Sequence, residues 1–81
     1  MYRIYFDCND SAETGNYGLW LGRSIADLAK IPGGPKEGMK VTIYMSDEIE
    51  MEAVLEWDAR WNAWTGRPVE GTIRENRESW D

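Results

Sequence analysis

The amino-acid sequence predicts a small, mainly β protein, in which an antiparallel sheet of about five strands curls into a partly open barrel beside one short helix. Two runs, residues 39–45 and 49–57, alternate apolar and polar side chains with the two-residue period of a half-buried strand. Clusters of Gly, Pro, Asn, Asp and Ser separate the other apolar runs, as in short strands joined by turns. At 81 residues the chain has room for one thin core, so we expect residues 1–81 to form a single domain.

The first half of the chain is expected to supply two strands and the helix. Residues 2–6, "YRIYF", are rich in aromatic and β-branched side chains, and "YGLWLG" at 17–22 predicts a short second strand. Residues 23–31, "RSIADLAKI", predict a helix that "PGGP" then ends. The helix prediction uses an apolar face and a polar pair at near capping-box spacing: Ile25, Leu28 and Ala29, and Ser24 and Asp27.

The two central strands constrain each other's register. With the exception of Val54, their apolar side chains fall at odd positions, so a slip of one residue would turn one row toward water. The connection must therefore pair Met45 with Ile49 and leave residues 46–48 as a three-residue loop, or form a five-residue loop in the same register. Two cross-strand pairs are then expected on the outer surface: Tyr44 with Glu50, and Thr42 with Glu52.

A helix is the alternative for residues 47–65, and it would make the protein α+β. It is supported by four apolar side chains spaced three, four and three residues apart: Val54, Trp57, Trp61 and Trp64. On a helical wheel, however, Glu50 falls in the middle of that apolar face while Met51 and Leu55 point away from it. Strands are therefore favoured. After them we expect a turn, a returning strand and a last strand: residues 58–62, 63–67 and those around Ile73.

The charge balance and the single cysteine limit the partners and the compartment. Fifteen acidic and nine basic residues give a net charge of −6 with no histidine, which opposes direct nucleic-acid binding. Six acids with no base among them crowd one stretch: Asp47, Glu48, Glu50, Glu52, Glu56 and Asp58. Cys8 has no disulfide partner, and neither a signal peptide nor a membrane-spanning run is visible, so we expect a cytoplasmic protein that binds no membrane.

Motifs for metals, phosphates and catalysis fail at the positions that matter. A calcium loop starting at Asp7 would place Ala12 where glycine is needed and Gly18 where a bidentate glutamate belongs. "GGPKEGMK" has the glycine spacing of a phosphate loop but has Met39 in place of its lysine. Without histidine, and without a base near Cys8 in the sequence, we expect no cofactor, no metal and no enzymatic activity.

The stretch "LEWDARWNAWTGRP", residues 55–68, holds three of the five tryptophans. Trp57 continues the apolar row of its strand and is expected in the core, but so thin a core cannot cover every indole. Trp61 and Trp64, with Tyr44 across the sheet, are therefore candidates for a partly exposed aromatic patch. Three acids would form its rim: Glu50, Glu52 and Asp58. The alternative is that the two tryptophans close one end of the barrel.

An aromatic patch beside acids resembles, in general design, the binding surface of SH3-like barrels, where aromatic grooves take extended or proline-rich peptides. The resemblance implies a non-enzymatic interaction module whose binding residues include Trp57 and whose partner is a protein or peptide with basic segments. A homodimer covering the same patch is a close alternative. Two others are an acidic decoy that imitates nucleic acid, and a small enzyme that uses a pair of carboxylates, which would need one carboxyl group with a raised pKa.

Overall fold

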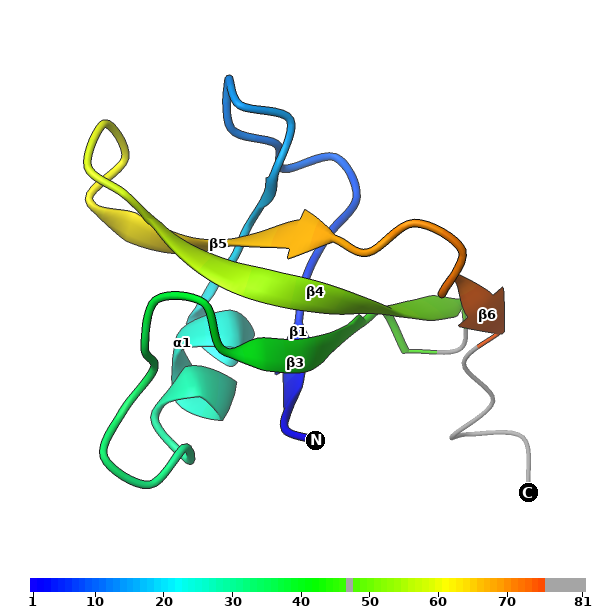
Figure 1. Cartoon of the computed structure of the whole chain (residues 1–81), viewed down its shortest axis with the longest axis horizontal. Coiled ribbons are helices and arrows are strands. Elements are labelled where there is room, and N and C mark those ends of the chain that lie inside the picture. The colour runs from blue at the N-terminus through cyan, green and yellow to red at the C-terminus, as the bar shows by residue number, and fades with distance from the viewer. Residues whose placement is uncertain (47, 76–81) are drawn as a thin grey trace.

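The computed structural model describes residues 1–46 and 48–75, and these form a mainly β structure with one short helix (Figure 1). The helix lies between the second and third strands, so the predicted fold class is confirmed. The elements follow in chain order: β1 (Arg3–Tyr5), β2 (Tyr17–Gly18), α1 (Gly22–Leu28), β3 (Lys40–Tyr44), β4 (Ile49–Asp58), β5 (Ala63–Pro68) and β6 (Arg74–Glu75).

Five strands form one curled sheet in the order β1-β3-β4-β5-β2, and β6 pairs with the start of β4. The sheet is an open half-barrel, consistent with an SH3-like small barrel. It departs from a purely antiparallel arrangement at one edge, where β1 runs parallel to β3. Parallel neighbours need a long crossover connection, and here the chain from β1 to β3 passes through β2 and α1.

The register predicted for β3 and β4 is confirmed. Tyr44 pairs with Glu50 and Thr42 with Glu52, and the Met45 amide donates to the Ile49 carbonyl at 2.8 Å. Residues 49–58 are therefore a strand, and the helical alternative for residues 47–65 is wrong. The alternating pattern predicted the strand correctly, because only a strand places the apolar side chains at odd positions on one face.

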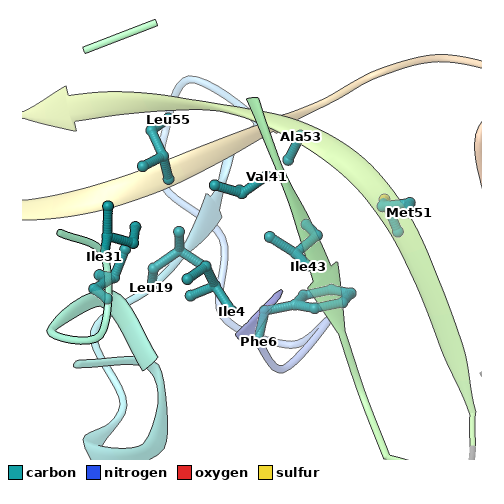
Figure 2. Packing of buried hydrophobic residues seen from close by; sticks show 10 residues of the cluster. Ile4, Phe6, Leu19, Ile31, Val41, Ile43, Met51, Ala53 and Leu55 are labelled. Atoms are coloured by element: carbon teal, nitrogen blue, oxygen red, sulfur yellow. The ribbon is translucent and has the colours of Figure 1, made fainter. Parts of the chain in front are cut away.

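The core lies inside the curl of the sheet, and α1 and the segment after it close one side (Figure 1). Apolar side chains at odd positions of β3 and β4 point into it, together with residues from β1, α1 and the connecting segments (Figure 2). Its buried members are Ile4, Phe6, Leu19, Leu28, Ile31, Val41, Ile43, Met51, Ala53 and Leu55. Trp64 is partly buried against this cluster, whereas Trp57 is not a member.

Helix α1 shields the outer edge of β1. Ser24 and Asp27, expected at the capping-box positions, do not cap the helix, because its N-cap is Leu21 and makes no side-chain hydrogen bond. Instead the Ser24 hydroxyl donates to the carbonyl of Tyr5 at 2.5 Å, and the carboxylate of Asp27 accepts from the Tyr5 amide at 3.0 Å. The backbone groups of an edge strand would otherwise be open to another chain.

The expected apolar face of the helix is only partly correct. Ser24 and Leu28 are the buried residues of α1, and Ile31 follows them into the core. Ile25 is 57% exposed and lies on the side of the helix that faces the β4–β5 turn. No helix in the part of the chain that the structure describes is long and apolar enough to span a membrane.

Candidate functional site

A groove of about 440 Å³ lies between α1 and the turn that joins β4 to β5. It is bounded by residues from the β2–α1 connection, from α1, from the segment before β3 and from both strands of the hairpin. Its lining residues include Trp20, Ile25, Pro35, Trp57, Trp61 and Trp64. Among the described residues none that lines it is charged, so the groove presents a largely apolar surface to solvent.

The rim of this groove holds much of the exposed apolar surface of the described residues. Six large hydrophobic residues are exposed among the described residues, and three of the six line the groove: Ile25, Trp57 (45% exposed) and Trp61 (47% exposed). These three come from α1, β4 and the β4–β5 turn, which are brought together only by folding. We call the surface formed by Trp20, Ile25, Trp57, Trp61 and Trp64 the tryptophan groove.

The expectation that Trp57 belongs to the core is wrong. Its side chain lies on the same face of β4 as Leu55, which is fully buried. However, β3 begins at Lys40, which pairs with Val54, so Trp57 lies beyond the end of the neighbouring strand. Only β5 flanks it there, and the indole packs edge-on against Trp64 with ring centroids 5.4 Å apart.

A second indole pair forms the other wall. The rings of Trp20 and Trp61 lie 4.8 Å apart and are tilted by 30°. Trp20 lies so close to Gly18 that a Cβ atom at position 18 would overlap the indole, so glycine is required there for the ring to take this place. The two pairs turn four aromatic rings toward one hollow, an arrangement suited to binding an apolar or cationic side chain.

Carboxylates fix the position of Trp61. Asp58 accepts hydrogen bonds from the backbone amides of Arg60 at 2.9 Å and Trp61 at 3.3 Å, which shapes the turn. Asn62 completes the turn with a left-handed backbone, φ 51°, which asparagine tolerates better than most residues. Across the molecule, Glu13 accepts from the indole N–H of Trp61 at 3.2 Å and from the guanidinium of Arg60 at 3.1 Å.

An acidic hollow of about 510 Å³ adjoins the tryptophan groove. Trp57 lines both, and three carboxylates line the acidic one: Glu13, Glu56 and Asp58. Another acid, Glu37, accepts a hydrogen bond from the backbone amide of Trp57 at 2.9 Å. Negative charge therefore lies beside both exposed indoles.

The predicted aromatic patch is assembled only in part. The structure brings Trp57, Trp61 and Trp64 together and places Asp58 beside them. Tyr44 is wrong as a member, because it pairs with Glu50 while Trp57 pairs with Trp64, seven residues further along β4. That separation is about 23 Å in an extended strand.

The expected exposure of Tyr44 and Glu50 on the outer face of the sheet is also wrong. Tyr44 is 6% exposed and Glu50 is 8% exposed, since other side chains cover this end of the sheet. Glu50 accepts from Arg3 at 2.9 Å and from Arg74 of β6 at 2.6 Å. Arg3 also lies over the ring of Tyr44, 4.7 Å from its centroid.

Arg3, Tyr44, Glu50 and Arg74 form a polar cluster, to which Asp27 of α1 also belongs. Its carboxylate accepts from the Tyr44 hydroxyl at 2.9 Å. Burial and this contact with Asp27 hold the pKa of Tyr44 above its usual 10.0. The cluster ties α1, β1, β3, β4 and β6 together and lies away from the tryptophan groove.

Glu52 and Glu56 of β4 are also paired with cations. Glu52 lies 3.7 Å from the ammonium group of Lys40 and lines neither the tryptophan groove nor the acidic hollow. Glu56 accepts from Asn16 at 2.8 Å and from Arg67 at 2.9 Å, and these hydrogen bonds hold its pKa below its usual value. Of the six acids, Asp47 lies outside the described residues.

The pairing of Glu50 predicts a loss of stability in acid. Burial alone would raise the pKa of its carboxyl group, but the hydrogen bonds and charges of Arg3 and Arg74 outweigh burial and hold the pKa below 4.5. A depressed folded-state pKa stabilises the protein above the unfolded value, and the contribution is lost as pH falls through the folded one. We expect Glu50→Gln to be less stable than the wild type at pH 7, with the difference shrinking below about pH 4.5. Urea unfolding of both proteins from pH 7 to pH 3 measures this, and a difference that stays constant would contradict it.

Sequence reasoning missed several groove residues. Trp20, Ile25 and Pro35 of the groove, and Glu13 beside it, are far from the hairpin in sequence, and no local pattern relates them to it. Within the described residues, no group of three or more His, Cys, Asp or Glu side chains could hold a metal ion. Comparison of the chain with protein-family models, curated proteins and solved structures gives no match.

Proposed function

We propose that this protein is a non-enzymatic interaction module that binds a segment of another protein in the tryptophan groove. The observation that carries the proposal is the gathering of Ile25, Trp57 and Trp61, all about half exposed, around one uncharged hollow. Exposed apolar patches rimmed by polar groups mark interaction sites, and tryptophan is among the residues that contribute most to binding energy.

Hydrogen bonds at two edges of the sheet favour binding in the groove over addition of a partner strand. At the β1 edge, Ser24 and Asp27 hydrogen-bond to the backbone of Tyr5. At the other edge, the amide of Gly18 in β2 already donates to the carbonyl of Asp10 at 2.8 Å. A partner strand would have to displace these contacts, whereas the groove is open.

Two alternatives receive less support. An acidic decoy needs a row of free carboxylates to imitate phosphates, but Glu50, Glu52 and Glu56 are each paired with a cation. An enzyme with a carboxylate pair needs one acid with a raised pKa, whereas the pKa values of Glu50 and Glu56 are lowered.

Selection of random dodecapeptides displayed on phage against the immobilised protein tests the proposal. We expect enriched peptides to lose about 30-fold or more in affinity for Trp61→Ala, because truncating a central tryptophan of an interface typically costs about 2 kcal/mol. Calorimetric titration with the synthetic peptides measures the loss. Ile73→Ala is the matched control, since Ile73 is 64% exposed but does not line the groove.

The fold of Trp61→Ala must be intact for the comparison to count. Amide NMR spectra that keep the wild-type dispersion establish this, and if the variant unfolds, Trp57→Leu replaces it in the same titration. Equal affinity of wild type and folded variant would contradict the proposal. So would a concentration-independent dimer of twice 9.4 kDa in sedimentation that Trp61→Ala converts to a monomer, because a second copy would then fill the groove.

A further inference from the structure

We infer that the tryptophan groove selects a partner segment by an arginine or lysine side chain, which lies on the exposed faces of Trp57 and Trp61 between Glu13 and Asp58. The inference deepens the proposed function and depends on it.

The carboxylates around the groove are attached to the exposed indoles themselves. Glu13 accepts a hydrogen bond from the indole N–H of Trp61, and Asp58 accepts one from the backbone amide of the same residue. Glu37 accepts one from the backbone amide of Trp57. Each exposed indole therefore has a carboxylate held at its edge, that of Glu13 being shared with Arg60, while about half of the side chain is open to solvent. A cation that stacks on such a face is attracted both by the ring and by the carboxylate beside it.

The protein already uses this type of contact on its other side. There the guanidinium of Arg23 lies 4.9 Å from the ring centroid of Tyr5, and that of Arg3 lies 4.7 Å from the centroid of Tyr44. The groove offers larger indole rings, which bind cations better than phenol rings. None of the described residues that line it is charged, so a cation on these rings would come from a partner rather than from that part of the chain.

Charge complementarity also decides between a basic segment and a second copy of this chain. The net charge is −6, and a symmetric dimer through the groove would bring Glu13, Glu37 and Asp58 of one copy close to those of the other. Like charges facing each other oppose association. The carboxylates that would repel a second copy of this chain attract a basic peptide.

The test uses the tightest dodecapeptide enriched on the wild-type protein and counter-selected against Trp61→Ala. We expect arginine or lysine to be enriched at one fixed position. Replacing an arginine there by citrulline, or a lysine by acetyl-lysine, removes the charge and should weaken binding about 3- to 30-fold, the range for a cation on an aromatic face. Glu13→Gln should weaken the arginine peptide but affect the citrulline peptide much less.

Glu13→Gln is informative because glutamine keeps an oxygen that can accept from the Trp61 indole while the charge is removed. Glu70→Gln is its control, since Glu70 is exposed, carries the same charge and lines neither hollow. If the citrulline peptide binds as tightly as the arginine peptide, the inference is wrong while the proposed function stands. If no peptide prefers wild type over Trp61→Ala, both fail.

Discussion

Leu55→Ala is expected to destabilise the protein by about 2 to 5 kcal/mol, the usual cost of truncating a fully buried leucine. Leu55 has no exposed surface, pairs with Gly66 of β5, donates its amide to the carbonyl of Met39 just before β3, and points its side chain into the core (Figure 2). For a chain of 81 residues the whole free energy of unfolding is about 4 to 12 kcal/mol. The substitution therefore removes a large share of the stability, and urea unfolding followed by tryptophan fluorescence measures the loss.

Trp57→Leu is the matched comparison, two residues further along the same face of β4. Its indole is 45% exposed, and leucine keeps an apolar contact with β5, so we expect a loss of about 1 kcal/mol from the missing aromatic pair. Peptide binding, by contrast, should fall strongly for Trp57→Leu. Equal destabilisation by the two substitutions would mean that Trp57 belongs to the core, and the tryptophan groove would not be a surface.

The contrast between Leu55 and Trp57 shows how far alternation predicts structure. The odd-numbered row correctly placed Leu55 in the core and fixed the pairing of β3 with β4. The same row continues to Trp57, but alternation states only on which side of a strand a residue lies. Whether that side is covered depends on where the neighbouring strand begins, and β3 begins too late to cover Trp57.

Tyr44 illustrates the reverse case. Its even position correctly places it opposite Glu50, on the face away from the main core. That face was expected to be solvated, yet β1, α1 and β6 supply side chains that cover it. These contacts join segments far apart in the sequence, and no local pattern predicts them. The polar cluster and the far wall of the tryptophan groove were both missed for this reason.

Asp27→Ala is expected to destabilise the protein by about 2 to 4 kcal/mol although Asp27 is charged and lies on a helix. Its carboxylate accepts from the Tyr5 amide and the Tyr44 hydroxyl. Alanine would leave both donors without their acceptor in a poorly hydrated place, and a buried donor without an acceptor costs about 1 to 3 kcal/mol. Thermal and urea unfolding measure the loss.

Lys30→Ala and Tyr44→Phe distinguish this explanation from an ordinary ion pair. Lys30 lies 3.7 Å from Asp27 and its side chain is 77% exposed, so its removal should cost less than about 1 kcal/mol. In a Tyr44→Phe background the hydroxyl donor is absent, so Asp27→Ala should cost less than it does in the wild type. Full additivity of the two substitutions would show that they do not interact.

Loss of Asp27 also frees one backbone group of the β1 edge, so a concentration-dependent rise in association would identify Asp27 as the residue that keeps this edge closed to other chains.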